Sequence, residues 1–267
     1  MTEKRATTSH EGRTDPARTL ALLWGEHSTS GRTGLGVDAI VAAAIELADA
    51  EGLEAVSMRR LADRLGVGAM SLYTHVPGKA VLVDLMQDAT LADLYTDTDE
   101  PARAGGGWRG GVEFVVDRNW DLYRRHPWLL HIVGARPVLG PNTSRKYEAE
   151  LRPLDGIGLT DVEMDAVLSL VLSHVTGTAR LLVSVEQTAR DSGLTDAQWW
   201  AATAPILERL LDPAAYPVSD RVGSAAGREH QAASSPQHAL RFGLDRILDG
   251  VDALVHQRAP LGQPSPE

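Results

Sequence analysis

The chain has 267 residues, 43% of them hydrophobic, a formal net charge of −10 at pH 7, and no cysteine. The lack of cysteine excludes disulfides, thiolate zinc sites and cysteine nucleophiles. No apolar run approaches about 18 residues and the first residues are polar, so we expect a cytoplasmic protein without a membrane span or signal peptide. The acidic total argues against indiscriminate binding to nucleic acid.

The N-terminal residues 1–34 are rich in Thr, Ser, Gly and charged residues, which predicts a largely disordered extension. One apolar island within it, Leu20 to Gly25, is a candidate for docking on the folded body. From Asp38 onward apolar residues recur at helical spacing, and Gly52 ends this first predicted helix in the way expected of a glycine just beyond a helix end.

Three further helices follow at short intervals. Ser57 is suited to cap a helix over residues 58–65, which Gly66 ends. Residues 68–75 fit a shorter helix, and a Pro-Gly pair separates it from a fourth helix over residues 79–95.

The charge of this region differs from that of the rest of the chain. Residues 57–79 carry a net charge of +3, so the remainder carries −13. A single basic segment on an acidic chain fits a confined anionic contact, although a solvated helix face would show the same charges. The charged residues of the segment are Arg59, Arg60, Arg64, Lys79 and Asp63.

The spacing of the second and third helices suits a helix-turn-helix, whose second helix enters the DNA major groove, about 12 Å wide. The small Ala62 permits close helix approach, and Gly66 suits a left-handed turn. Val67 and Leu72 would fill the angle between the helices. A hairpin that only packs in a protein core would show the same spacing. The side chains left outward are Ala69, Met70, Tyr73, Thr74 and His75.

The stretch from Val37 to Leu94 resembles the DNA-binding region of TetR-type transcriptional regulators, most specifically in VGAMSLYTHVPGK, residues 67–79. The resemblance implies an all-α protein with a helix-turn-helix domain over residues 35–95. It implies a larger helical ligand-binding and dimerisation domain over residues 96–267.

The same resemblance assigns DNA contacts to individual positions. Gly68 is implied as a DNA-contacting residue. Ala69 and Met70 lack hydrogen-bonding groups, so base reading should rely on thymine methyl groups and DNA shape. Contacts with phosphate or sugar are implied for Ser57, Arg59, Ser71, Tyr73, His75 and Lys79, and contacts with bases for Ala69, Met70 and Thr74.

Beyond this region, residues 97–107 have the composition of a linker, and residues 213–236 that of a mobile loop. No strand pattern competes with the helical ones. Helical patterns cover residues 108–126, 127–134, 142–156, 160–190, 195–211 and 237–257.

An aromatic cluster between Trp108 and Trp128 suggests an apolar cavity with a few polar groups, as small-molecule sites have. A tightly packed core is the alternative. The resemblance implies that an inducer binds in this domain and releases DNA. We predict no cofactor and no metal site, although the histidines permit a metal-bridged ligand. The ligand-binding candidates are Trp108, Phe114, Trp120, Tyr123, His126, Trp128, His131, His174 and Thr178.

A single recognition helix makes few phosphate contacts and would bind DNA weakly, whereas a symmetric dimer reads a palindrome. The resemblance likewise implies a homodimer. Two apolar helices are candidates for the interface, although both would serve equally as core helices. The interface candidates are Leu168, Val171, Leu172, Val175, Leu240, Leu244, Ile247 and Val251.

The chain carries no His-Glu-x-x-His, Gly-x-Ser-x-Gly or phosphate-binding glycine loop, so we do not expect an enzyme. We expect a ligand-responsive homodimeric repressor that binds a palindromic operator in double-stranded DNA and is released by a small apolar or aromatic inducer. A helical protein-interaction module without DNA binding, and an activator of the same fold, are the alternatives.

Overall fold

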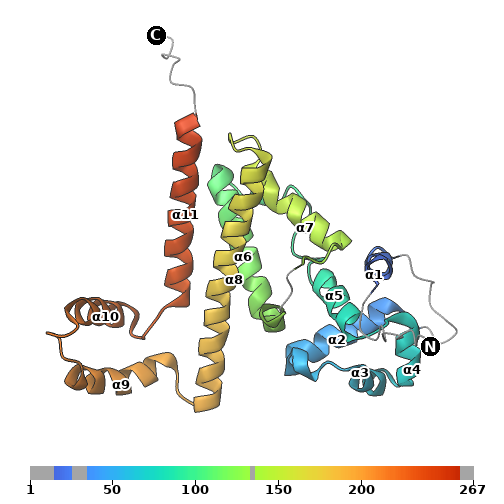
Figure 1. Cartoon of the computed structure of the whole chain (residues 1–267), viewed down its shortest axis with the longest axis horizontal. Helices are drawn as coiled ribbons and strands as arrows, with labels where there is room; N and C mark the ends of the chain where they lie inside the picture. The colour runs from blue at the N-terminus through green and yellow to red at the C-terminus, as the bar shows by residue number, and fades with distance from the viewer. Residues whose placement is uncertain (1–14, 26–34, 133–135, 259–267) are drawn as a thin grey trace, which may run out of the picture. The chain divides into compact units, whose positions relative to one another are not determined.

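The computed structural model describes residues 15–25, 35–132 and 136–258, and within these ranges the chain is helical without a strand (Figure 1). The predicted all-α fold class is confirmed. The helices are α1 (Pro16–Leu23), α2 (Val37–Glu51), η1 (Leu53–Ala55), α3 (Met58–Leu65), α4 (Ala69–His75), α5 (Lys79–Ala89), η2 (Pro101–Arg103), α6 (Gly107–Arg125), η3 (Pro127–His131), α7 (Pro141–Leu151), η4 (Arg152–Leu154), α8 (Asp161–Ser192), α9 (Asp196–Leu210), α10 (Pro217–His230) and α11 (Pro236–Arg258).

The chain divides into two compact units. The first unit runs to Thr96 and also takes in His131–Glu148, and the second comprises Asp97–Leu130 and the chain from Ala149 onward. Residues 131–148, which were expected in the second domain, therefore belong to the first unit.

Four helices form the core of the first unit. α2 packs against α3 and α5, and α3 packs against α4. Burial of one large apolar side chain contributes about 2 kcal/mol, so the seven-residue α4 is held by its neighbours rather than by its own helix propensity. Side chains fully buried in this core include Ile40, Leu61, Leu72, Leu82 and Met86.

The N-terminal extension contains a helix, α1, where the sequence predicts disorder around the apolar island. Asp15 caps α1 by accepting a hydrogen bond of 3.0 Å from a backbone N–H of the first turn. Leu22 is buried, α1 packs against α5, and the indole Nε1 of Trp24 donates to the carbonyl of Leu139 at 3.0 Å. The apolar island thus docks on the first unit, while the rest of the extension lies outside the described residues.

A buried carboxylate joins α5 to the start of α7 within the first unit. Asp88 is 4% exposed and accepts hydrogen bonds from the backbone N–H groups of Asn142 and Thr143, at 3.3 and 2.8 Å. The side chains of the same two residues donate to it at 3.0 and 2.9 Å. The first N–H groups of a helix have no partner within the helix, so Asp88 satisfies them and is itself satisfied by them.

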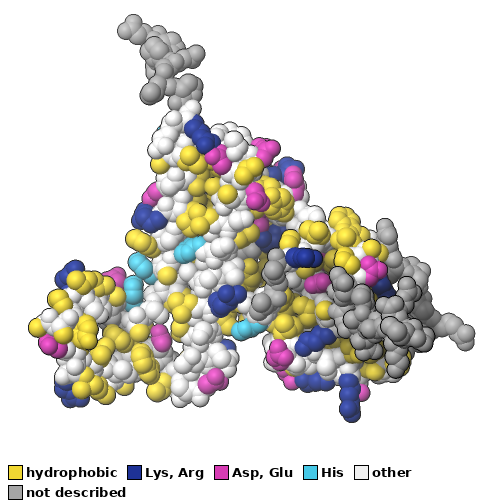
Figure 2. All heavy atoms as spheres, viewed as in Figure 1, with side chains coloured by type: hydrophobic (Ala, Val, Ile, Leu, Met, Phe, Trp, Pro, Cys, Tyr) yellow, Lys and Arg dark blue, Asp and Glu magenta, His cyan; other side chains and the backbone are white. Residues whose placement is uncertain are grey.

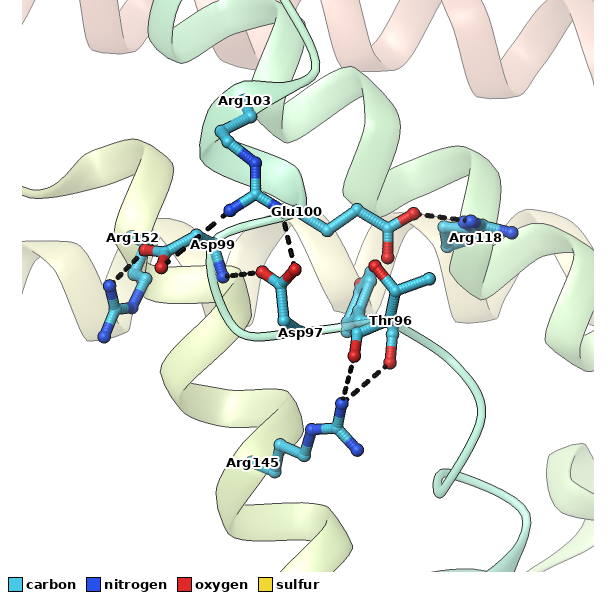
Figure 3. Close-up of polar contacts among 9 residues, drawn as sticks. Thr96, Asp97, Asp99, Glu100, Arg103, Arg118, Arg145 and Arg152 are labelled. Carbon is cyan, nitrogen blue, oxygen red and sulfur yellow. Dashed lines mark hydrogen bonds and ion pairs between the residues drawn. The ribbon is translucent and has the colours of Figure 1, made fainter.

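The helix α5 ends at Ala89 instead of near residue 95. The carbonyl groups of Tyr95 and Thr96 accept hydrogen bonds of 3.1 and 2.7 Å from the guanidinium of Arg145 on α7 (Figure 3). Tyr95 is also buried, so the chain after α5 is held in an irregular conformation by tertiary contacts.

Residues 97–107 are not the loose linker that their composition predicts. They contain η2, with Pro101 buried, and ion pairs in the second unit (Figure 3). A hydrogen bond from Arg103, followed by one from a backbone N–H, lowers the pKa of the Asp97 carboxyl below its usual range. The ion pairs join Asp97 to Arg103, Asp99 to Arg152 and Glu100 to Arg118.

The second unit is organised around α8, which packs against α6 and α11. By length and composition α8 is apolar enough to cross a membrane. Its apolar positions instead form a shared core with its two neighbours. Buried members of this core include Val112, Val116, Leu168, Val171, Val175, Leu240, Leu244, Leu248 and Val251.

This core corrects the predicted dimer interface. Apolar periodicity identifies the buried face of a helix but not which neighbour buries it, and here the neighbour lies in the same chain. Leu172 and Ile247 are partly buried against the same core. The other six candidates are buried within one chain and have little surface left for a second copy; they are Leu168, Val171, Val175, Leu240, Leu244 and Val251.

The predicted mobile loop over residues 213–236 is also wrong, because most of it forms α10. Pro217 occupies the first turn of α10, where a missing N–H costs nothing. α9 precedes it and begins with a capping box between Thr195 and Gln198. The two helices form a hairpin in which they run in opposite directions (Figure 1).

Candidate DNA interface

The α3–α4 turn has the local geometry that a helix-turn-helix requires. The Ser57 side chain caps α3 by accepting from the backbone N–H of Arg60 at 3.3 Å. At the other end Gly66 is left-handed, with φ 67° and ψ 30°, and the N–H of Val67 donates to the carbonyl of Ala62 at 3.0 Å. This pattern ends α3 abruptly and lets α4 start at Ala69, after three intervening residues.

The short helix α4 buries one side chain and presents most of the others. Leu72 is fully buried, whereas Met70 is 77% and Tyr73 44% exposed. Ser71 and Thr74 are exposed as well. The predicted outward orientation of Met70, Tyr73 and Thr74 therefore agrees with the structure, while their contacts with DNA stay a prediction.

The remaining predicted DNA-contacting residues surround this face. Gly68 is exposed at the start of α4, and Ala69 and His75 are half-buried at its two ends. The Thr74 hydroxyl donates to the Ser71 carbonyl of its own helix at 2.6 Å. The face at Ala69, Met70 and Thr74 is therefore rich in methyl groups and poor in hydrogen-bond donors.

The positive charge near α4 is smaller than the sequence window suggests. Arg60 pairs with Glu51 at 2.8 Å. Arg64 pairs with Glu46, also at 2.8 Å. Both glutamates lie on α2, outside the window of residues 57–79. The packing of α2 against α3 would have identified them, but a count of charges within the window does not.

Two basic residues remain to meet a polyanion. Arg59 is exposed and makes no ion pair with any residue that the structure describes. Lys79 is exposed at the start of α5, and its Nζ donates to the carbonyl of Leu53 at 3.3 Å. At a helix N-terminus the dipole adds to the attraction of Lys79 for phosphate.

The predicted ligand-binding residues do not converge on one site. Trp108 and Trp120 are partly buried against the core of the second unit, as is Tyr123, whose hydroxyl lies 3.1 Å from Oγ1 of Thr176. His174 hydrogen-bonds the carbonyl of Leu240 through Nε2 at 3.0 Å, and Thr178 donates to the carbonyl of His174 at 2.8 Å. These five candidates pack the helical core.

The other four candidates do not form one cluster either. Arg118 stacks over the Phe114 ring at 5.0 Å. His126 packs edge-on against the buried Trp128 at 6.2 Å. His131 is exposed and belongs to the first unit. The aromatic clustering in the sequence therefore reflects packing at several places rather than one cavity.

Two cavities lie elsewhere in the described parts of the chain, and none of the nine candidates lines either of them. One, of about 390 Å³, lies in the first unit beside α1, α2 and α5. The other, of about 480 Å³, lies between α9 and α10. Sequence reasoning missed the second because α10 was expected to be a loop. The sequence signal for the groove was the four-residue spacing of Gly223 and Gly227, which places both glycines on one face of a helix.

Comparison with known families matches both parts of the chain. Residues 40–86 match the model for bacterial regulatory proteins of the tetR family. Residues 100–255 match the model for the tetracyclin repressor-like C-terminal domain. Together the two matches cover the helix-turn-helix and most of the second unit.

Individual relatives agree with these matches. The chain is 42% identical to the HTH-type transcriptional repressor DrrR1 of Streptomyces coeruleorubidus, over 96% of this chain and 93% of DrrR1. It is also similar to the solved structure of ActR from Streptomyces coelicolor in complex with actinorhodin, with a TM-score of 0.68 and 27% identity over 84% of this chain and 99% of that one. The chain therefore belongs to the TetR family of transcriptional regulators.

Proposed function

We propose that this protein is a cytoplasmic, homodimeric repressor that binds a palindromic operator through α4 and leaves it when a small apolar or aromatic molecule binds. The observation that carries the proposal is the exposed face of α4 around the buried anchor Leu72. The relatives support it, since DrrR1 is named as a repressor and ActR was solved with actinorhodin bound. The protein acts by binding and not by catalysis.

In this proposal α4 reads bases mainly through methyl groups. The side chains of Ala69 and Met70 contact thymine methyl groups, and the Thr74 methyl adds to them because its hydroxyl is directed to its own helix. The other predicted contacts fix the position on the backbone. These phosphate or sugar contacts are made by Ser57, Arg59, Ser71, Tyr73, His75 and Lys79.

The homodimer in this proposal uses the outward faces of α8 and α11. Leu170 on α8 is 53% exposed and Phe242 on α11 is 55% exposed, although both are large and apolar. Gly177 on α8 and Gly250 on α11 are also exposed, and small residues permit close helix packing. A second copy that covers this face would bury apolar surface that the single chain leaves in water.

Tyr73→Ala tests the role of α4. The operator is first selected from random duplexes with the wild-type protein, and affinity is then measured by gel retardation. The variant should bind more weakly by over about 1 kcal/mol, the scale of a hydrogen bond to a charged group, with an unchanged circular dichroism spectrum. Tyr216→Ala, at an exposed tyrosine of the second unit, is the matched control. Equal affinity of Tyr73→Ala and wild type would remove α4 from the interface.

A further inference from the structure

The groove between α9 and α10 has two unlike walls. The α9 wall is mostly apolar, with Trp200, Leu207 and Leu211, and carries one carboxylate, Glu208. The α10 wall is built from small residues, including Gly223 and Ser224. Hydrophobic side chains gather over this hairpin in the surface view (Figure 2). At about 480 Å³ the groove has the volume of a small-molecule site.

Two glycines explain why the groove exists. A Cβ at Gly227 would lie 2.5 Å from Cζ2 of Trp200, so α10 rests directly on the indole there. A Cβ at Gly223, one turn away, would have nothing within 4 Å. The helices therefore touch at the indole and remain separated beyond it, because α10 offers no bulky side chain to fill the space.

Because α9 and α10 run in opposite directions, the acidic and basic residues of the groove lie at different ends. Trp200 faces Gly227, and Glu208 lies eight residues after the one and Asp220 seven before the other, so both carboxylates lie toward the opposite end of the groove. Eight helical residues span about 12 Å. Arg228 lies at the Trp200 end, away from both carboxylates. The groove thus has an aromatic end and an acidic end.

Among the residues that line the groove, Arg228 is the one basic residue, and it lies at the Trp200 end. Asp220 is half-buried, Glu208 is exposed, and neither forms an ion pair with any residue in the described ranges. A carboxylate partly withdrawn from water beside an apolar wall is stabilised by a positive group. We propose that this groove binds an elongated aromatic cation, with its rings against Trp200 and Leu207 and its ammonium group between Glu208 and Asp220.

The inference adds a place and a chemical class to the ligand response, and its link to repression rests on the proposed function. Binding itself does not involve the operator. The test is therefore a titration without DNA, so that failure of the site and failure of the DNA interface are distinguished.

Quinacrine serves as the probe, because it joins an acridine ring to an aliphatic amine that is protonated at neutral pH. Its matched partner is 9-amino-6-chloro-2-methoxyacridine, which has the same ring without the amine chain. Both are titrated into the full-length protein by calorimetry. Quinacrine should bind the wild type at one site per chain and about fivefold more tightly than its partner, the scale of one partly exposed ion pair.

Two variants localise the binding. Asp220→Asn should remove most of the fivefold preference for quinacrine, and Glu229→Gln, at an exposed carboxylate of α10 outside the groove, should retain it. Gly223→Leu fills the open space and should weaken both probes by more than tenfold. Circular dichroism verifies that each variant is folded.

Three results would overturn the proposal. The first is the absence of saturable quinacrine binding to the wild type. The second is binding that a folded Gly223→Leu variant retains, which would place the probe elsewhere. The third is a wild-type dimer that this variant dissociates, as seen by light scattering, because a second copy would then occupy the groove.

Discussion

In two helix pairs of the second unit a glycine lets the helices approach closely, but one pair forms a filled core and the other leaves a groove. In the α8–α11 pair, a Cβ at Gly243 would lie 2.3 Å from the His174 ring. In the α9–α10 pair, Gly227 meets Trp200 in the same way. Around Gly243 the facing positions are Leu and Val, which close the core, whereas around Gly227 they are Gly and Ser, which leave a groove. The glycine permits close approach, and the bulk one turn away decides between core and cavity.

The largest expected effect comes from breaking the filled pair. Leu244→Asp combined with Val251→Asp places two carboxylates in the core of the second unit. Each buried charge without a partner costs several kcal/mol, so the second unit should lose its cooperative unfolding transition. Circular dichroism during heating measures this loss.

The matched control changes the outward face of the same two helices. Leu170→Asp combined with Phe242→Asp should leave the chain folded, because both positions are more than half exposed. Light scattering should then report a monomer in place of a dimer. A folded Leu244→Asp and Val251→Asp variant would show that the core does not depend on these positions.

A smaller effect is expected from the glycines themselves. Gly243→Ala forces the His174 ring to move, although its Nε2 is bonded to the Leu240 carbonyl at 3.0 Å. Overpacking of this kind costs about 1–3 kcal/mol of stability. The higher helix propensity of alanine offsets up to about 1 kcal/mol of this loss.

Gly227→Ala should be nearly neutral, because the Trp200 ring borders an open groove and has room to shift. Urea unfolding of both variants measures the difference. Equal losses of stability would contradict the distinction between a filled and an unfilled pair.

The smallest effect concerns a link at the far end of the filled pair. Hydrogen bonds from Arg258, and then from the backbone N–H and hydroxyl of Thr160, lower the pKa of Glu163 to about 2. A carboxyl whose folded pKa lies below its ordinary value of 4.5 stabilises the fold above that value. This contribution should be lost as the pH falls from about 4.5 to about 2.

Urea unfolding at several pH values in this window tests the link. Glu163→Gln should make stability less dependent on pH there, because the variant has no carboxyl to titrate at that position. An unchanged pH dependence would mean that Arg258 does not hold Glu163 in solution.

The helix-turn-helix was predictable because each position has a local reason. Ser57 can cap only a helix that begins after it, Gly66 suits a left-handed residue, and Leu72 lies on the inward side of a short helix. The partners Glu46 and Glu51 were not predictable from the charge window, since they lie on a different helix. Local signals thus predicted the position of α4 but not the ion pairs that reduce the positive charge near it.

The second unit was harder to predict because its outcome depends on which elements meet. Leu244 and Val251 were correctly identified as an apolar face, but sequence periodicity does not distinguish a neighbour in the same chain from one in a second chain. α10 was missed because Gly223 and Gly227 are typical of loops and lower helix propensity. Its packing on Trp200 is a tertiary effect that no local pattern contains.

The ion pairs of Arg60 and Arg64 affect how the protein searches a chromosome. Nonspecific binding to DNA depends on unpaired basic side chains, which displace counterions from the phosphates. With Arg60 and Arg64 paired to glutamates, we expect Arg59 and Lys79 to contribute most of the nonspecific DNA affinity of each chain. We therefore expect short residence on unrelated DNA and a shallow response to ionic strength, so that most of the time in the cell is left for encounters with cognate sites.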